Sequence, residues 1–593
     1  MASPADGPLK RFIGEIHRRS LWQVLGIYLV ASWAVLQVVD TLGGALRLPE
    51  WIEPMALVLL IIGLPIVLAT AFVQEGGPRH VATPTADVPT GVPALFTWRK
   101  TFVGGVLAFA LLGFVGTGWV LFGGGIGGGS GRGDAPTIEQ SVAVLPFVNM
   151  SGDPDNEYFS DGITEELLNA LAQLPDLRVP GRTSSFALKG QNLRNQQIAD
   201  TLGVAHILEG SVRRSGETVL ITARLVDAQS DTQLWSATFE RELEDIFAIQ
   251  REIATAIADQ LRVSLSVDQQ ARLVGEATES TDAYEAYLRG RYLWSQRSDE
   301  SLRNAIAQFE RAIELDSGYA EAFSGLADSY VLVDVYDPNP EALDYRANYQ
   351  RALVAAQRAV SLAPELATAR ASLGMVLGMI GSWERGEEEL DSAIRLNPGL
   401  ATAHQRYGMH LATMGRGNEG VPYAERAFEL DPLSRGISYN LGNVYRLAGM
   451  REQAIEQLRA TTELDPDWLT GWFNLATELL EAGRYEEGLE AWDVTLRLGN
   501  YDVRLGTEAY EAAIRYQETG EAASFADFDT GLFQLLWLYA RSGQPARAID
   551  WFEVLIRQGA YLIAAQLHVM FVDDAVGDDP RYQALLEEAG ITW

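Results

Sequence analysis

The sequence contains no cysteine in its 593 residues and only six histidines. The absence of cysteine excludes disulfide bonds, thiol catalysis, iron–sulfur clusters and cysteine-ligated zinc. His404 and His410 are six residues apart, about 240° around a helix, so they cannot share one ligand face. His206 lies in a predicted strand with no second histidine nearby and is more readily a core or edge residue than a ligand. We therefore predict no metal site and no cofactor.

Short catalytic motifs are also missing. The sequence has no GxxxxGK[ST], no HExxH and no GxSxG pattern. A GxGxxG match occurs within the glycine-rich segment 123–133, but no strand is predicted before it and no helix after it, so a dinucleotide site is disfavoured. A carboxylate pair assembled from distant segments remains open as an alternative. The sequence predicts no catalytic residue, and we expect the protein not to be an enzyme.

Positive charge is scarce in most of the chain, whose formal net charge is −33. Residues 1–137 contain 9 Lys and Arg against 8 Asp and Glu, whereas the remainder contains 37 against 71. An acidic surface of this kind repels phosphate backbones, so we predict no nucleic-acid partner. Its simplest meaning is solubility, and an acidic docking site is the alternative.

Long apolar runs are confined to the N-terminal part, at residues 21–42, 55–73 and 101–122. Each run has about the 20 residues that a helix needs to cross a bilayer, so the sequence predicts a three-helix membrane module over 21–122 in contact with lipid. A signal peptide is the alternative for the first run, disfavoured by its length. Basic residues gather before the first run and between the last two. This asymmetry places residues 1–20 in the cytoplasm and everything after residue 122 on the outer side of the membrane. In a Gram-negative bacterium, the helices would then lie in the inner membrane and the later residues in the periplasm.

A small α/β domain is predicted over residues 138–268, after a Gly-rich linker at 123–137. The apolar run 141–147 predicts a buried strand, and Asp161 followed by Glu165 and Glu166 predicts the start of a helix. Further elements are expected as follows: a helix over 191–202, a hairpin of 206–213 and 218–227 around Ser215 and Gly216, a strand over 233–240, and an amphipathic helix over 249–261. The acidic residues at 153–166 favour helix capping over a metal site, because their spacing is not that of a calcium loop.

Motifs in this domain resemble a known family. They are SVAVLPFVNMSGDPDNEYFSDGITEELLNALAQLPDLRVPGRTSSFALKG, then LGVAHILEGSVRRSGETVLITARLVDA, then LWSATFERELEDIFAIQREIA. In this order they resemble the TolB-N-terminal-like (FlgO-like) domain of bacterial membrane proteins, which precedes tetratricopeptide repeats in many of them. Related architectures carry a cytoplasmic cyclase, winged-helix or kinase domain before the membrane. Here only residues 1–20 precede the first predicted helix, so this chain departs from that pattern.

A 34-residue period dominates the C-terminal half. It is marked by Pro364, Pro398, Pro432 and Pro466, and glycines, leucines and alanines keep the same step. This period, with small residues between paired helices and proline at the end of the second, is typical of the tetratricopeptide repeat. The sequence therefore predicts an all-α repeat solenoid over 281–593 with a polar C-terminal cap, and an insertion at about 334–345.

Repeats of this kind bind peptides or proteins on the concave face formed by their first helices. The repeat register assigns seven candidate residues to that face: Gln405, Met409, Tyr439, Asn443, Arg446, Phe473 and Thr477. Asn443 with Arg446 resembles part of a clamp for a C-terminal carboxylate, although its other basic positions are missing. Ordinary packing between helices is the alternative for the aromatic residues.

The predicted function follows from these parts. We expect a membrane-anchored scaffold or receptor for protein–protein interactions, using a periplasmic repeat array. The alternative is a signal-transducing sensor whose outer domains control a separately encoded cytoplasmic effector. Both rest on domain type, which hosts a function without proving it.

Overall fold

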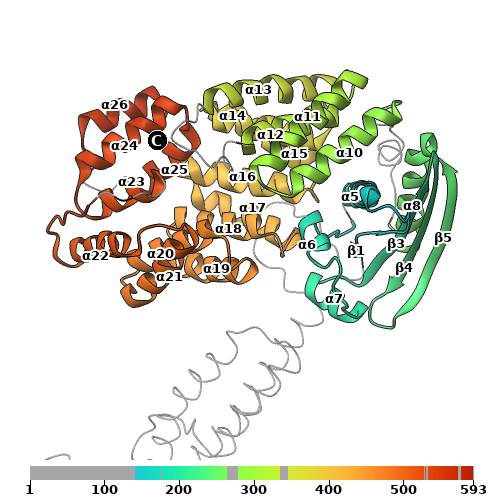
Figure 1. Ribbon diagram of the computed structural model, residues 1–593, viewed down its shortest axis with the longest axis horizontal. Helices are drawn as coiled ribbons and strands as arrows, with labels where there is room; N and C mark the ends of the chain where they lie inside the picture. The colour runs from blue at the N-terminus through green and yellow to red at the C-terminus, as the bar shows by residue number, and fades with distance from the viewer. Residues whose placement is uncertain are drawn as a thin grey trace, which may run out of the picture. The chain divides into compact units, whose positions relative to one another are not determined.

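The computed structural model describes residues 140–591, except 175, 264–277, 334–344, 527, 529–531 and 572–575. All of these residues belong to one compact unit, Arg132–Trp593. Within this unit a small sheet with its helices precedes a long series of paired helices (Figure 1).

The prediction of three transmembrane helices is corrected here, because the structure does not support it. Among the residues that it describes, no helix is both long enough and apolar enough to cross a bilayer. Among the described repeat helices, α13 (Tyr345–Leu362) carries three arginines along its 18 residues. The predicted runs at 21–42, 55–73 and 101–122 lie outside the described residues, as does the linker at 123–137. The described structure supports a mostly helical repeat fold with a small sheet, and it does not support the three transmembrane helices or the location in the inner membrane and periplasm that the sequence predicts.

The sheet contains five strands. They are β1 (Val142–Val144), β2 (Val148–Asn149), β3 (His206–Ser215), β4 (Thr218–Asp227) and β5 (Thr232–Glu242). The order is β1-β3-β4-β5, with β2 also pairing β3; β1 and β2 run parallel to β3, and β3, β4 and β5 are antiparallel neighbours. The predicted hairpin is confirmed, and Gly216 adopts the left-handed φ of 63° that its tight turn needs.

Helices cover both faces of this sheet. They are η1 (Pro154–Asn156), α5 (Glu157–Ala172), α6 (Arg182–Ala187), α7 (Asn195–Leu202), η2 (Leu243–Asp245) and α8 (Ile246–Gln260). Leucines and isoleucines of α5 and α8 share a core with β4, whereas Ile198 and Leu202 of α7 pack against Ile207 on the other face. The helix that was predicted to begin at Asp161 begins at Glu157 instead. Asp161 is buried and binds Lys189, so it does not cap the helix.

Paired helices follow from residue 281 onward. The pairs are α10 (Thr281–Ser295) with α11 (Asp299–Leu315), α12 (Ala320–Val333) with α13, α14 (Ala367–Met379) with α15 (Trp383–Leu396), α16 (Ala401–Thr413) with α17 (Gly417–Leu430), α18 (Arg435–Leu447) with α19 (Arg451–Leu464), and α20 (Leu469–Glu481) with α21 (Tyr485–Leu498). The chain continues with α22 (Val503–Thr519), α23 (Leu532–Arg541), α24 (Pro545–Gln558), α25 (Tyr561–Phe571) and α26 (Pro580–Glu588). This architecture confirms the predicted repeats. Gly408 shows why the period needs small residues: an added Cβ would lie 2.9 Å from the carbonyl oxygen of Gly420 on the partner helix.

The sheet and the first repeats share one hydrophobic core. Buried residues of this core extend from Val142 in β1 to Leu377 in α14. Leu288 of α10 packs so closely on Gly162 of α5 that a Cβ there would be 2.7 Å from it. The Tyr158 hydroxyl donates to Glu285 across the same junction, at 3.1 Å. The α/β region and the repeats are therefore held together by side-chain packing over several elements.

The first helices of successive pairs form an inner layer, since α12, α14, α16 and α18 each contact the next. A late helix, α25, contacts α14, α16 and α18 as well, and Figure 1 shows it beside them. Arg346 at the start of α13 donates to the Ile556 carbonyl oxygen and to the Tyr561 hydroxyl, both at 3.1 Å. Part of the inner layer is thus covered by the chain's own C-terminal helices.

Candidate functional site

A cavity of about 1090 Å³ lies on the remaining part of the inner layer. Its floor comes from equivalent positions of the first helix in successive repeats, among them Ser324 in α12, Ser372 in α14, Arg406 in α16 and Asn440 in α18. These residues occupy the sixth position of their repeats or an adjoining one, which faces inward in each helix. The cavity therefore follows the repeat axis across several pairs.

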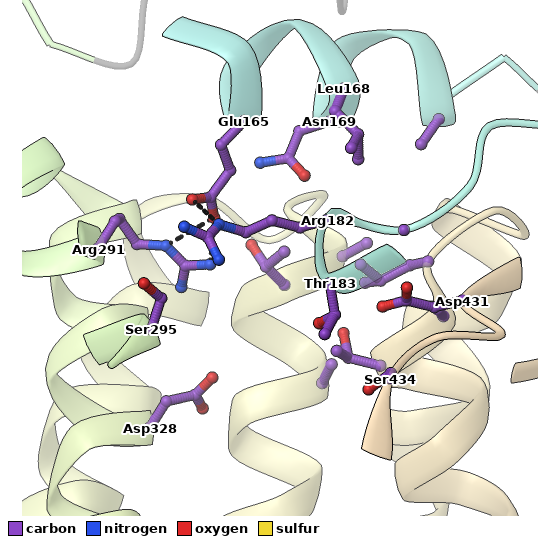
Figure 2. A pocket seen from close by; sticks show the side chains of 18 of the residues that line it. Glu165, Leu168, Asn169, Arg182, Thr183, Arg291, Ser295, Asp328, Asp431 and Ser434 are labelled. Atoms are coloured by element: carbon purple, nitrogen blue, oxygen red, sulfur yellow. Dashed lines mark hydrogen bonds and ion pairs between the residues drawn. The ribbon is translucent and has the colours of Figure 1, made fainter. Parts of the chain in front are cut away.

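The α/β region closes the opposite side. Figure 2 shows Glu165, Leu168 and Asn169 on α5, and Arg182 and Thr183 on α6, facing the repeat helices. The cavity is consequently a site between two structural parts of one compact unit.

Glu165 lies at the centre of this junction, with only 5% of its side chain exposed. Arg182 of α6 donates through Nε to Oε2 at 2.7 Å, and Arg291 of α10 donates through Nε to Oε1 at 2.9 Å. Burial acts to raise the pKa of Glu165, but the two guanidinium groups outweigh it and hold the pKa below its ordinary value. One carboxylate thus links three helices.

Asp328 of α12 forms a second ion pair in the cavity. Arg406 of α16 donates to its Oδ2 at 2.7 Å and also approaches Ser372 Oγ at 3.4 Å. The other carboxylate oxygen, Oδ1, is buried and has no hydrogen-bond partner among the described residues. Figure 2 shows this carboxylate pointing from α12 into the space before the neighbouring helices. A buried acceptor without a donor is costly, so this atom is suited to a ligand.

Two further carboxyl groups, Glu166 of α5 and Glu321 of α12, line the same cavity. Burial raises the pKa of Glu166 to about 8, and Glu165 and Glu321 add repulsion. Burial also raises the pKa of Glu321 to about 7, with a smaller contribution from Asp316. Both groups therefore hold protons near neutral pH to a degree that ordinary glutamates do not.

This predicts a pH dependence of stability. Because the folded-state pKa of Glu166 lies above its ordinary value, its contribution is fully present below pH 4.5 and is lost as the pH rises through about 8. We expect Glu166→Gln, which mimics the protonated acid, to reduce the loss of stability between pH 6 and pH 9 by about 1–2 kcal/mol, allowing for partial exposure. Urea unfolding at several pH values measures this. The exposed Glu518→Gln should leave the profile unchanged, and identical profiles for all three proteins would contradict the prediction.

The turn between α17 and α18 fixes the α/β region at the cavity's edge. The Gly181 amide donates to the Leu430 carbonyl oxygen at 2.7 Å, and the Ser184 amide donates to Asp431 Oδ1 at 2.7 Å. The Ser184 hydroxyl accepts from the Leu433 amide at 2.9 Å. Burial raises the pKa of Asp431 although hydrogen bonds from Ser184 and Thr183 oppose it. Asp431 thereby binds the N-terminal end of α6.

Of the seven residues predicted for the concave face, the structure brings Gln405 and Tyr439 to the cavity. Gln405 donates through Nε2 to the Gly436 carbonyl oxygen at 3.3 Å. The Tyr439 ring lies 4.9 Å from the Trp468 ring, in an edge arrangement. Both side chains are half-buried, so they remain accessible to a ligand.

The other five lie among packed helices. Asn443 is 1% exposed, donates to the Tyr439 carbonyl oxygen at 3.1 Å and accepts from Arg446 at 2.5 Å. Arg446 also lies 3.7 Å from Glu478, so the basic group expected for a carboxylate clamp faces an internal carboxylate. Met409 packs against a small core cluster, and Phe473 and Thr477 are buried. Peptide binding by these five residues stays a prediction.

Sequence reasoning missed Glu166, Arg291 and Asp328. The signal for Asp328 was present, since a step of 47 residues back from Met375, the ninth position of its repeat, reaches Asp328; a further step of 34 residues reaches Trp294 and not Arg291. The register was carried only downstream from Pro364, because the segment 334–344 interrupts the period. No periodicity could have found Glu166, which comes from outside the repeats.

Histidines and carboxylates do not assemble a metal centre in the part of the chain that the structure describes, where no group of three or more His, Cys, Asp or Glu could hold a metal ion. His404 and His410 each bond a backbone carbonyl oxygen, that of Pro398 at 3.0 Å and that of Trp383 at 2.9 Å. Burial lowers the pKa of His404 to about 4. These two histidines act in helix packing.

Comparisons with known proteins agree with the repeat architecture. A family model described as tetratricopeptide repeat matches residues 436–467. The chain therefore contains tetratricopeptide repeats. Among solved structures it is similar to YrrB, described as a repeat protein with an unusual peptide-binding site, at 23% identity over 34% of this chain and 97% of that one, with a TM-score of 0.26. It is also similar to a thermophilic repeat protein of Thermus thermophilus, at 20% identity over 33% of this chain and 99% of that one, with a TM-score of 0.28.

A curated relative is similar over a limited part. It is called putative adenylate cyclase 3, from Rhizobium meliloti (strain 1021), and is 39% identical over 187 residues. This match covers 32% of this chain and 32% of the relative. The chain thus spans about a third of the length of that protein.

Proposed function

We propose that this protein binds an extended segment of a partner protein in the cavity between its inner repeat helices and α5 and α6. The observation that carries the proposal is the cavity itself, which follows the first helices of successive repeats and presents polar side chains along its length. Tetratricopeptide repeats provide a surface for protein interaction, and an extended chain can follow such a surface from repeat to repeat.

The position of the cavity supports a binding role over a purely structural one. α25 contacts α14, α16 and α18, whereas the cavity is lined by residues from the first halves of the same helices, where a partner can reach the inner layer. Asp328 Oδ1 offers a hydrogen-bond acceptor there. Gln405, which donates to the Gly436 carbonyl oxygen, and Tyr439 also present polar groups to the cavity. Polar groups of this kind fix the orientation of a bound peptide and give specificity.

The resemblance of the α/β region to the TolB-N-terminal-like domain stays a prediction, and the proposed function does not depend on it. In the structure, this region forms one wall of the cavity. The name of the Rhizobium relative describes that protein, and the proposed binding function needs no catalytic group in this chain. The proposed scaffold acts through recognition alone.

The cavity can be blocked without disturbing the core. An added Cβ at Gly436 meets only the Gln405 amide nitrogen, at 4.0 Å, so a larger side chain there extends into the open space. The full-length wild-type chain is first tested on an array of random ten-residue peptides to find those that it binds. We expect Gly436→Trp to bind these peptides at least tenfold more weakly than wild type does. Fluorescence of the labelled chain on each peptide measures this.

Glu490→Trp on the exposed face of α21 is the matched control, since it adds the same ring outside the cavity. It should retain the wild-type peptide set. If Gly436→Trp binds the same peptides with equal strength, or if wild type selects none, the cavity is not a peptide site and the proposal is wrong.

A further inference from the structure

We propose that the cavity contains a subsite for a basic side chain of the bound peptide, a lysine or an arginine, formed by Glu166 of α5, Glu321 of α12 and Oδ1 of Asp328. This inference rests on the proposed function and specifies the chemistry of the partner. It comes from three independent features: the pairing of charges in the cavity, the buried acceptor, and the spacing of these groups.

Three arginines of the cavity bind carboxylates within it, and two carboxyl groups of the cavity form no ion pair. Arg182 and Arg291 both donate to Glu165, and Arg406 donates to Asp328. In contrast, neither Glu166 nor Glu321 forms an ion pair with any residue that the structure describes, although both line the cavity. A basic side chain of a ligand would pair with these two carboxyl groups.

The buried acceptor supplies the second feature. Asp328 is 7% exposed, and its Oδ1 has no partner within the described chain while Oδ2 binds Arg406. A donor from the ligand would complete this carboxylate. Ammonium, guanidinium and backbone N–H groups all supply such a donor, and charged donors form the stronger bond.

The spacing supplies the third feature. Glu321 and Asp328 are seven residues apart in α12, so they lie on one face of the helix and about 10 Å apart along its axis. About three residues of an extended peptide cover this length. A peptide that runs along α12 can therefore place a basic side chain between Glu166 and Glu321 while another donor reaches Asp328.

The charge of the chain favours the same partner. From residue 138 onward acidic residues outnumber basic ones by 71 to 37, and the resulting negative potential attracts a basic peptide and speeds its association. An acidic peptide would meet repulsion both at a distance and at Glu166 and Glu321.

A basic ligand should change the protonation of the cavity. Glu166, with a pKa of about 8, is largely protonated at pH 7, and Glu321, with a pKa of about 7, is partly protonated. When an ammonium group enters, the carboxyl proton passes to the buffer and the carboxylate pairs with the ammonium. The groups that act on Glu166 are Glu165 of α5, Tyr287 and Arg291 of α10, and Glu321 of α12, while Arg182 of α6 and Arg251 of α8 line the same cavity. Arg182 and Arg291 bind Glu165, so the two glutamates are the groups that respond.

Isothermal titration calorimetry tests this inference with a capped pentalysine peptide and the full-length chain at pH 7. Titrations in phosphate and in Tris, which differ in ionisation enthalpy, give the number of protons released. We expect release of about one proton per bound peptide. We expect the double variant Glu166→Gln/Glu321→Gln to bind about tenfold more weakly and to release none.

The control double variant Glu490→Gln/Glu518→Gln removes two exposed carboxylates, so it reduces the negative charge of the chain by more than the test variant does at pH 7. It should keep the proton release and stay within about twofold of the wild-type affinity, since exposed charges contribute little. Equal weakening by both double variants, or binding without proton release, means that pentalysine binds the acidic surface and overturns the subsite. Release of the same proton by Mg²⁺ alone also overturns it, in favour of a metal ion. If Gly436→Trp abolishes peptide binding while the glutamine variants do not alter it, the proposed function stands and this inference fails.

Discussion

Replacing Glu165 with alanine is expected to lower the free energy of unfolding by about 3–5 kcal/mol, because it removes a buried carboxylate and leaves two half-buried guanidinium groups without their partner. Arg182 and Arg291 come from α6 and α10, and each directs its Nε at a different oxygen of Glu165. Figure 2 shows the three side chains meeting at the edge of the cavity. The loss of this carboxylate should weaken the attachment of the α/β region to the first repeat as well as the fold itself.

Urea unfolding of the full-length chain, followed by far-ultraviolet circular dichroism, measures this effect. The matched control is Glu209→Ala on β3, which removes an exposed pair with Arg224 on the same sheet. Exposed pairs contribute at most about 1 kcal/mol, so the control should change little. Equal losses in the two variants would show that Glu165 is no more than a surface charge, against the burial described above.

Phe473→Ala and Tyr439→Ala are expected to have opposite consequences although both residues occupy the fifth position of neighbouring repeats. Phe473 is 8% exposed, and its ring lies 6.0 Å from the rings of both Trp492 and Trp537. Removing a buried aromatic ring costs about 3–5 kcal/mol, so Phe473→Ala should destabilise the fold strongly. Tyr439 is half-buried at the cavity, so Tyr439→Ala should weaken peptide binding with a smaller loss of stability, about 1–2 kcal/mol.

The two variants are compared in one unfolding series and on one peptide array, below the transition of the less stable protein. Under those conditions folded Phe473→Ala should retain the wild-type peptides, and Tyr439→Ala should lose them. If Phe473→Ala has the same urea midpoint of unfolding as wild type but no longer binds the wild-type peptides, Phe473 is a binding residue, as the repeat register predicts.

The repeats were predictable because their signal is local and regular. Each pair needs a small residue where its helices meet, a glycine at the turn and a proline after the second helix, so the requirement recurs every 34 residues. Gly408 against the Gly420 carbonyl oxygen is one such contact. The hairpin of β3 and β4 was predictable for the same reason, since alternation and a turn glycine specify it within a short stretch.

The site was less predictable because equivalent sequence positions receive different neighbours. The fifth position faces inward in every repeat, but α22 and α23 add aromatic residues around Phe473, whereas Tyr439 borders the cavity. Arg446 donates to Asn443 and also pairs with Glu478. Because Glu478 belongs to α20 of the next repeat, the register of a single repeat cannot predict this pairing. The register can say that a residue faces inward but not whether the chain itself fills the space before it.

By itself the sequence determined the repeat period, the hairpin of β3 and β4, the acidity of the chain from residue 138 onward, and the absence of cysteine chemistry. These properties depend on residues close together in the chain or on composition. Only the tertiary structure decided which part of the inner layer is open, because α25 returns from the C-terminal end to cover α14, α16 and α18, and α5 and α6 come from before the repeats to close the cavity. It also placed Glu166 opposite Glu321, which are separated by 155 residues. Contacts over such separations leave no periodic trace, since each is made once and by packing alone.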